Sequence, residues 1–287
     1  MNTLPADHQA CAAILSRSGS SFALPIRLLP EAKRQGTTAI YAFCRLADDL
    51  VDDAPDEATA TAGLSAFTSE TEEALAGRPV NDPVLRALVD TVRRYAIPEG
   101  AVRDILAGVR MDLTQPRYAT WAELERYCSC VASAVGVAAI HVWGYTDPTA
   151  IALSHDCGIA FQLTNILRDI PEDLGRRRIY LPHDDFLACG CAEDDLVAGR
   201  IGPGFTRLAI LEVDRARACY QRAAAIDGML STDGRKVFRA MFGLYRGMLE
   251  AVQRAGPSIF TARVRPSRPR LLAAAAATLL CGTRRLR

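Results

Sequence analysis

The feature that most constrains this chain is "CRLADDLVDD", residues 44–53, where four aspartates fall within six positions of an otherwise apolar stretch. Asp is a poor helix former and is rarely buried without a partner. In a helix, residues four apart share one face, so Asp48 and Asp52 point the same way, and Asp49 and Asp53 lie about 100° further round. Because paired buried carboxylates repel each other, they need a cation. The stretch therefore predicts an apolar helix that carries part of a cation site.

A second acidic stripe occurs in "FQLTNILRDIPEDLG", residues 161–175. Asp169 and Asp173 are again four residues apart, Asn165 lies one turn before Asp169, and Gln162 lies one turn earlier still. Amide and carboxylate oxygens thus follow one face of another apolar helix. Pro171 falls between the two acids, and we expect it to kink or end the helix there.

Two acidic stripes about 120 residues apart can face each other across a helical bundle, and bundle cores commonly hold metal sites built in this way. Oxygen ligands without His or Cys favour Mg²⁺, or Mn²⁺, over zinc. Mg²⁺ is held by one or two carboxylates together with water and substrate phosphates, which predicts a phosphorylated ligand. Arginines beside the stripes can bind its oxygens: Arg45, Arg168, Arg176, Arg177 and Arg178. A single pair of aspartates four residues apart on a helix is usually solvated and has no function. A di-iron site is a further alternative, but it would need a Glu-x-x-His pattern that is absent here.

The rest of the chain predicts an all-α fold in a single domain over residues 1–287, because no stretch shows sustained alternation of apolar and polar residues. Thr120 and Glu123 form a predicted capping box at the start of a long helix. Ala and Leu dominate, and aromatic residues make up 7% of the chain. The expected helices span 7–28, 31–53, 57–77, 83–96, 98–113, 121–145, 148–170, 203–230 and 232–255.

Charge and cysteine usage exclude several classes of protein. The net charge of +1 gives no reason to expect nucleic-acid binding. Nine cysteines without a CxxC pair, and four isolated histidines, favour reduced thiols in a cytoplasmic protein over a zinc site. We expect no signal peptide, and no segment long enough to span a membrane.

The tail, residues 263–287, holds seven arginines and no acidic residue around the apolar run "LLAAAAATLLC". Such a segment is typical of a helix at a membrane interface, and equally of an ordinary helix with a solvated basic face. The first alternative predicts peripheral attachment to the inner face of the membrane.

Four segments together resemble the family of head-to-head prenyl synthases, which contains the phytoene and squalene synthases. They are "SGSSFALPIRLLP" (18–30), "YAFCRLADDLVDD" (41–53), "ELERYCSCVASAVG" (123–136) and "AFQLTNILRDIPEDLGRRRIYLP" (160–182). The resemblance covers about residues 10–270. It implies an isoprenoid-synthase-type helical bundle around a central apolar cavity, in which two prenyl diphosphates are joined with the help of Mg²⁺. It assigns the metal to Asp48, Asp52, Asn165, Asp169 and Asp173, and the substrate diphosphate to Ser18, Ser20, Ser21, Arg45, Gln162, Asn165, Arg168, Tyr245 and Arg265.

The resemblance also bears on the substrate. Phe22 and Tyr41 are candidates to stabilise an allylic cation by cation–π attraction, whereas we expect Phe161 to be a core side chain. By analogy with the family, Ile26 and Thr38 face the cavity, and side chains of this size leave room for C20 chains. We therefore expect phytoene formation from two geranylgeranyl diphosphates through a cyclopropylcarbinyl diphosphate.

Ser129 departs from the family pattern, which usually has Tyr at this position. The alternative is therefore a presqualene diphosphate synthase that acts on two farnesyl diphosphates. A non-catalytic assembly protein of the same fold is less expected, because such a relative would have lost the carboxylates. A head-to-tail chain elongator or terpene cyclase would carry differently built acidic motifs. With no dinucleotide fingerprint, we expect no use of NADPH.

Overall fold

Helices make up the regular structure of residues 4–265 and 267–283, the part of the chain that the computed structural model describes, apart from two isolated β-bridges. The all-α prediction is therefore confirmed. The order of elements is α1 (Leu4–Arg17), α2 (Ala23–Ile26), α3 (Glu31–Asp52), α4 (Glu57–Leu75), α5 (Pro83–Tyr95), α6 (Glu99–Thr114), α7 (Trp121–Cys128), the π-helical η1 (Ser129–Ser133), α8 (Ala134–Trp143), α9 (Thr149–Gly175), α10 (His183–Ala188), α11 (Glu193–Val197), α12 (Pro203–Ala223), the 3₁₀-helical η2 (Ala224–Gly228), α13 (Thr232–Ala255), the 3₁₀-helical η3 (Gly256–Phe260) and α14 (Arg268–Cys281).

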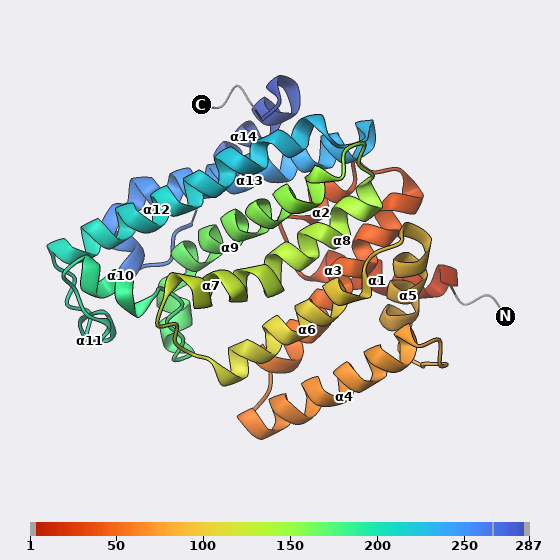
Figure 1. The fold of residues 1–287 in the computed structure, drawn as a ribbon, viewed down its shortest axis with the longest axis horizontal. Helices are drawn as coiled ribbons and strands as arrows, with labels where there is room; N and C mark the ends of the chain where they lie inside the picture. Colours follow the sequence, from red (N-terminus) through yellow and green to blue (C-terminus); the bar gives the residue numbers. More distant parts are fainter. Residues whose placement is uncertain (1–3, 266, 284–287) are drawn as a thin grey trace.

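The helices form three rough layers (Figure 1). Helices α7, α8 and α9 run through the middle, with α3 beside them, and α12, α13 and α14 cover one side. Helices α4, α5 and α6 cover the other side. Helix α9 packs on α12, α13 packs on α14, and α3 packs on α1 and α5. The central helices are thus enclosed on both sides.

The predicted helix over residues 7–28 was wrong, because the chain leaves the helix after Arg17. Gly19 has φ of 63°, in the left-handed region that ends helices. The Ser18 hydroxyl donates to the carbonyl of Leu15 at 2.8 Å, and the Ser20 hydroxyl accepts from the amide of Phe22 at 3.2 Å. These local bonds satisfy backbone groups that the helix leaves unpaired.

Three other helices differ from the prediction in detail. The long central helix contains the π-helical turn η1, a feature found often at functional sites. Helix α9 continues through Pro171 to Gly175, so Pro171 does not end it. The predicted helix over 203–230 finishes with the 3₁₀ turn η2. Thr120 accepts from the amide of Glu123 at 3.3 Å, as predicted, but the Glu123 carboxylate accepts from the amide of Ala119 at 2.7 Å instead of completing the capping box with Thr120.

The central helix, Trp121–Trp143, is by length and composition the one helix in the described part of the chain that could cross a membrane, although nearly half of it is buried inside the protein. Judged by length and composition, the prediction that no segment is long enough to span a membrane was therefore wrong. The helix lies in the middle of the bundle (Figure 1) and packs against α6 and α9. A core helix in this position is expected to be apolar on all sides.

Helix α9 approaches η1 most closely at Gly158. A Cβ atom added to Gly158 would lie 2.4 Å from the Cα of Ser133, which is too close for any real contact. The two backbones can pack at this distance only with glycine at position 158.

We expect Gly158→Ala to lower the free energy of unfolding by about 1–3 kcal/mol, because the added methyl group forces the two backbones apart. Urea unfolding measures this change. Gly100→Ala, where nothing lies within 4 Å of the added atom, is the control and should be neutral or stabilising. An unchanged midpoint for Gly158→Ala would show that the two helices separate at no cost.

Candidate active site

A cavity of about 980 Å³ lies at the centre of the bundle. Its α3 wall consists of Thr37, Ile40, Tyr41, Cys44, Arg45 and Asp48, which recur every three or four residues and so share one helix face. Thr38 is buried and lies about 90° from the centre of this face, just beyond Arg45 at its edge. It does not line the cavity, so the prediction for Thr38 was wrong, whereas Ile26 does line it.

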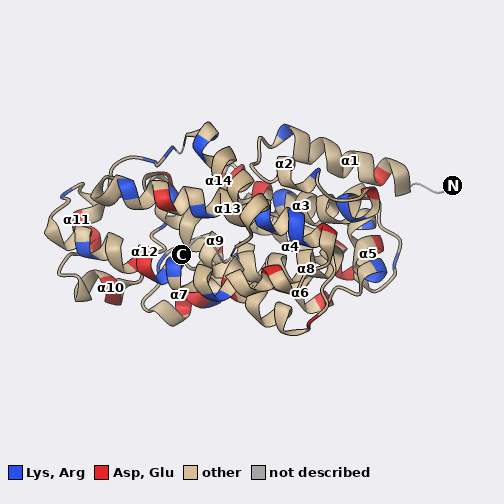
Figure 2. Ribbon diagram, turned by 90° about the horizontal axis from the view of Figure 1, so that it is seen from above, with Lys and Arg blue, Asp and Glu red and all other residues tan. Residues whose placement is uncertain are grey.

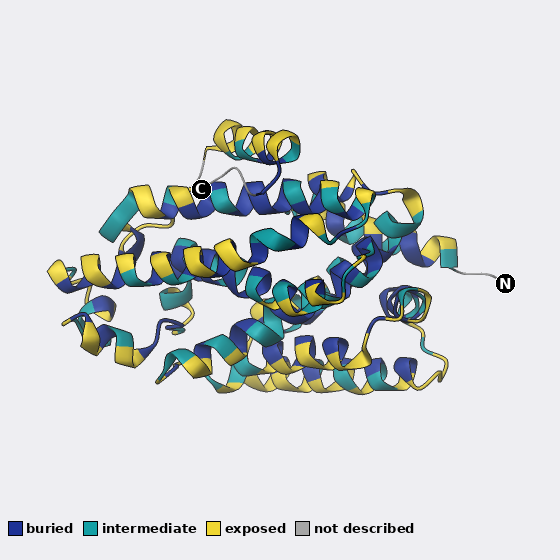
Figure 3. Ribbon diagram, turned by 45° about the horizontal axis from the view of Figure 1, so that its top comes forward, coloured by how far each residue is buried: buried dark blue, intermediate teal, exposed yellow. Residues whose placement is uncertain are grey.

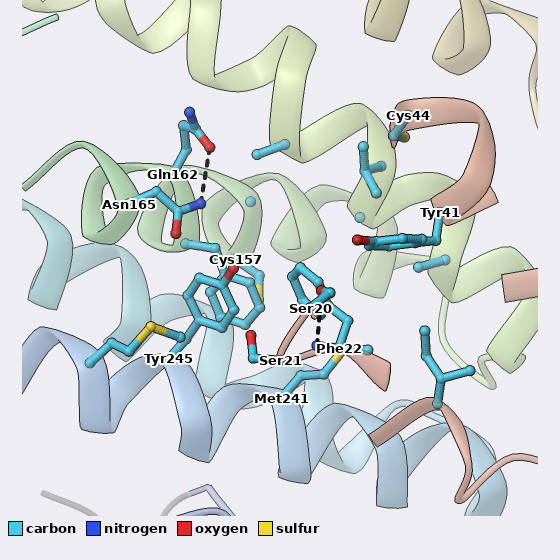
Figure 4. A pocket seen from close by; sticks show the side chains of 18 of the residues that line it. Ser20, Ser21, Phe22, Tyr41, Cys44, Cys157, Gln162, Asn165, Met241 and Tyr245 are labelled. Carbon is cyan, nitrogen blue, oxygen red and sulfur yellow. Dashed lines mark hydrogen bonds between the residues drawn. The ribbon is translucent and has the colours of Figure 1, made fainter. Parts of the chain in front are cut away.

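The wall opposite α3 carries an aromatic stack. The rings of Phe161 and Tyr245 are nearly parallel with centroids 4.1 Å apart, and Phe22 stacks on Tyr245 at 5.5 Å. Tyr41 meets Phe22 edge to face at 6.4 Å. All four line the cavity, so the expectation that Phe161 is only a core side chain was wrong. Figure 4 shows Phe22, Tyr41 and Tyr245 around the same space.

The loop between α1 and α2 brings three hydroxyl groups to the cavity, from Ser18, Ser20 and Ser21. Ser20 and Ser21 lie near Phe22 and Tyr245 in Figure 4. The break in the first predicted helix therefore has a local consequence. In a continuous helix these three side chains would point in different directions around the axis, whereas the loop places all three at the cavity.

Helix α9 contributes a polar group of side chains, Gln162, Asn165 and Arg168, which all line the cavity. The Asn165 amide donates to the Gln162 carbonyl oxygen at 3.4 Å (Figure 4). The Asn165 Oδ1 atom is buried and has no hydrogen-bond partner. A buried acceptor without a partner is costly, so this atom is available to a ligand.

In the first acidic stripe Asp48 lines the cavity, whereas Asp49, Asp52 and Asp53 do not. Asp48 opens to the cavity, and Asp52 accepts from Arg176 at 2.7 Å and from Arg178 at 3.1 Å. Asp49 instead pairs with Arg45 at 2.5 Å. The protein that surrounds Asp48 on most sides, together with the Asp112 and Asp52 carboxylates, raises the pKa of Asp48 to about 7. The side chain remains accessible through the cavity, however.

In the second stripe, Asp169 pairs with Arg168 at 2.6 Å and with Arg263 at 2.8 Å. Burial and the neighbouring Asp169 carboxylate raise the pKa of Asp173 to about 7. The arginines that follow Asp173 on the chain reach Asp52 of the first stripe, which joins the two stripes through ion pairs. The predicted metal and diphosphate roles of these residues stay predictions.

Sequence reasoning missed Asp112, in the last turn of α6. Asp112 accepts from the hydroxyl of Tyr180 at 2.7 Å and from that of Tyr127 at 3.2 Å. Burial raises the pKa of its carboxyl group, and its charge in turn raises the pKa of Asp48. The one available signal was an acid at a helix C-terminus, where the helix dipole disfavours negative charge.

Residues 263–265, here called the C-terminal strap, run along the cavity and line it. Arg263 bridges Asp169 at 2.8 Å and Glu172 at 2.7 Å, and the Val264 amide donates to the carbonyl of Arg168 at 3.2 Å. Sequence reasoning singled out Arg265 here and missed Arg263, whose partners lie about 90 residues away in the chain.

Ser129 does not line the cavity. It begins the π-helical turn, and its hydroxyl donates to the carbonyl of Glu125 at 2.7 Å. Ser129 therefore provides no proton donor that faces the cavity.

The site fits Mg²⁺ only together with a ligand that brings further oxygens. No group of three or more His, Cys, Asp or Glu side chains among the residues of known placement could hold an ion by itself. The available donors are all oxygen, and they include the unpartnered Oδ1 of Asn165. Mg²⁺ commonly takes one or two carboxylates and completes its shell with water and substrate phosphates.

An α-helical bundle around a cavity of this size, with acids, amides and arginines at one end, defines the isoprenoid-synthase class of fold. Solved structures agree: a dehydrosqualene synthase matches with a TM-score of 0.86 and 29% identity over 95% of both chains. The squalene synthase HpnC from Alicyclobacillus acidocaldarius matches with a TM-score of 0.81 and 30% identity, over 88% of this chain and 95% of the other.

The squalene/phytoene synthase family model matches residues 15–270. The 15-cis-phytoene synthase of Synechococcus elongatus is 38% identical over 270 residues, which cover 89% of this chain and 87% of the relative. The phytoene synthase of Arthrospira platensis is 37% identical over 273 residues, with the same coverage. The chain belongs to the squalene/phytoene synthase family, whose members transfer prenyl groups.

Proposed function

We propose that the protein joins two geranylgeranyl diphosphates head to head and converts the cyclopropylcarbinyl diphosphate that results into phytoene. The central cavity carries this proposal, because it combines an apolar body of about 980 Å³ with an acidic and basic end. This volume is at the upper end for small-molecule sites, as two long prenyl chains require. The phytoene synthases that share 37–38% of their residues with the chain support the same reaction.

Two groups of residues have separate roles: one binds the diphosphate, and the other shields the cation from water. Arg45 and Arg168 line the cavity and are placed to bind diphosphate oxygens. Asp48, Asp52, Asn165, Asp169 and Asp173 would hold Mg²⁺, which when bound neutralises the charge of the leaving diphosphate.

When the diphosphate leaves, an allylic cation remains that water would quench, and the apolar walls keep water out. Phe22, Tyr41 and Tyr245 line the cavity, and aromatic rings in this position are able to stabilise the cation. The double bond of the second chain then attacks the cation, and loss of a proton from the carbon that carried the diphosphate closes the cyclopropane. A second ionisation and rearrangement, with loss of a proton, gives the C40 polyene.

Presqualene diphosphate synthesis from two farnesyl diphosphates is the second candidate. Ser129 favours it, because no tyrosine at this position faces the cavity. A non-catalytic role is disfavoured, because all four predicted aspartates are present and Asp48 opens to the cavity.

The substrates are prenyl diphosphates, and we place the enzyme in the cytoplasm, on the inner face of the membrane. The basic tail supports this placement, because anionic lipids attract arginine-rich segments. Part of the tail lies in α14, whereas Arg284, Arg285 and Arg287 fall outside the described residues.

The proposal is tested by incubating the purified chain with Mg²⁺ and either C20 or C15 prenyl diphosphate, without NADPH, and identifying the lipid product. Phytoene from the C20 substrate is the expected result. Presqualene diphosphate from the C15 substrate, with no turnover of C20, would overturn it in favour of the second candidate. No diphosphate release from either substrate would contradict both.

A further inference from the structure

From Leu271 to Cys281, the exposed face of helix α14 carries no charged side chain. Residues 271–283 contain no charged residue, and the helix lies on the outside of α13 (Figure 1). Figure 3 shows it as the mostly exposed helix at the top of the view, and Figure 2 draws most of it without charge. The exposed side chains are Leu272, Ala273, Ala276, Ala277, Leu280 and Cys281, with Leu280 at 85% exposure.

Packing against α13 accounts for the apolar residues on the inner face of α14 but not for those on its outer face. Ala275 and Thr278 are buried against α13, where Gly243 leaves room for the helix to approach. A surface helix normally carries polar residues on the opposite side. A helix that is apolar on both sides is normally covered on both, so the outer face of α14 is a contact surface.

The charge around α14 indicates what covers it. No acidic residue follows Glu250 in the sequence. Arg265, Arg268 and Arg270 are exposed at the beginning of the helix, and none of them forms an ion pair with a described residue. A symmetric dimer through this face would bring two copies of the same basic segment into one interface, with no acidic residue of the segment to balance them, which is unfavourable. An anionic lipid surface complements both the arginines and the apolar face.

The position of α14 relative to the cavity points to the same partner. Arg268 and Leu271, in the first turn of the helix, line the cavity, as does the C-terminal strap that precedes them. The first turn of α14 therefore borders both the cavity and the surface, since Arg268 is also exposed. A hydrocarbon product that leaves here would emerge next to the apolar outer face.

We propose that the outer face of α14 is a docking surface that inserts into the headgroup region of an anionic bilayer, with Leu272 and Leu280 in the lipid and the arginines against the headgroups. The docking itself does not depend on the reaction. The release of product from the cavity into the bilayer beside α14 rests on the proposed function.

Vesicle flotation tests the docking. The full chain should float with vesicles that contain phosphatidylglycerol and should bind more weakly to pure phosphatidylcholine vesicles or at high salt. Leu272→Glu and Leu280→Glu should each lower the affinity about tenfold or more, because a buried leucine contributes about 1.5–3 kcal/mol. Arg270→Gln should lower it about fivefold, since one arginine near an anionic surface contributes about 1 kcal/mol.

Matched controls come from α10 and α11, at one end of the molecule (Figure 1). Leu187 and Val197 are also large exposed apolar residues, in α10 and α11, so Leu187→Glu and Val197→Glu should leave flotation unchanged. Equal losses for these controls would mean that binding is unspecific, and would overturn the proposal. Flotation that is unaffected by Leu280→Glu would overturn it as well. Size-exclusion chromatography with light scattering must show the same mass for wild type and Leu280→Glu, because a fall from dimer to monomer would assign the face to a second copy.

The chain supplies a probe for the depth of insertion. Cys281 is the one exposed cysteine in the described part of the chain. An environment-sensitive fluorophore on its thiol should shift to shorter wavelength with anionic vesicles, and Cys281→Ser should remove this signal. An unshifted probe would contradict insertion. Because neither readout requires turnover, loss of docking and loss of the proposed reaction remain distinguishable.

Discussion

Asp48→Asn is expected to lower kcat/KM at least about 100-fold, because it removes a carboxylate from the place where the charge of the leaving diphosphate must be neutralised. The fold should remain intact, since Asn has nearly the same shape as Asp. The protein around Asp48 and its acidic neighbours disfavour the charged form, so a neutral amide causes no loss of stability. Diphosphate release at saturating Mg²⁺ measures the effect, and thermal unfolding checks the fold.

Asp53→Asn is the matched control on the same helix. Asp53 is exposed at the end of α3 and points away from the cavity, so its loss should change kcat/KM less than about twofold. Asp169→Asn should behave like Asp48→Asn. Full activity of Asp48→Asn would contradict the metal assignment. Equal losses of kcat/KM in Asp48→Asn and Asp53→Asn would show that activity depends on the total charge of the helix and not on the position of the carboxylate.

Mg²⁺ binding is expected to depend steeply on pH. Without metal, the pKa values of Asp48 and Asp173 are about 7, so both carboxyl groups are mostly protonated at lower pH. Because Mg²⁺ must displace these protons, its apparent affinity should rise about tenfold per pH unit for each group below pH 7, and should level off above it. Titration with Mg²⁺ in the presence of inorganic diphosphate, monitored by thermal unfolding, measures the change.

The free energy of unfolding should change with pH in opposite directions in the metal-free and the metal-bound protein. Because the folded, metal-free state holds protons that the unfolded state releases near pH 4, its stability falls as the pH rises from about 4 to 7. Mg²⁺ with diphosphate should reverse this trend. Buried Glu212 contributes in the same direction, since burial raises its pKa to about 8. The difference with and without Mg²⁺ therefore isolates the site.

Asp112→Asn provides the control for this pH dependence. Removing the Asp112 charge lowers the pKa of Asp48, so Mg²⁺ binding should become favourable at lower pH than in the wild type. An unchanged pH dependence in this variant would show that the two carboxyl groups are not coupled.

Much of the candidate site could be predicted because its residues recur with helical spacing. The stripe of Tyr41, Arg45 and Asp48, and that of Gln162, Asn165 and Arg168, follow directly from periods of three and four. Thr38, which analogy with the family had placed at the cavity, lies at the edge of the same face, only about 20° round the helix from Arg45. Helical spacing alone therefore could not exclude it, and the packing of the neighbouring helices decides that it does not line the cavity.

The remaining parts depend on contacts between distant segments. Asp112 acquires its importance from Tyr180, which is 68 residues away, and Arg263 from Asp169 and Glu172. The end of the first helix depended on the left-handed turn at Gly19. A glycine within a helical pattern can mark either a tolerated small residue or a stop, and only the surrounding bonds decide between them.

Pro171 lies inside α9, between Asp169 and Asp173, and removes one backbone hydrogen bond from the helix. Proline has no N–H group, so the carbonyl of Leu167, four residues earlier, receives no helical hydrogen bond. The turn that carries Asp173 is therefore able to tilt against the turn that carries Asp169 without breaking a bond at this point. In the proposed reaction, this freedom would let the spacing of the two carboxylates follow the diphosphate as it changes from ester to free ion.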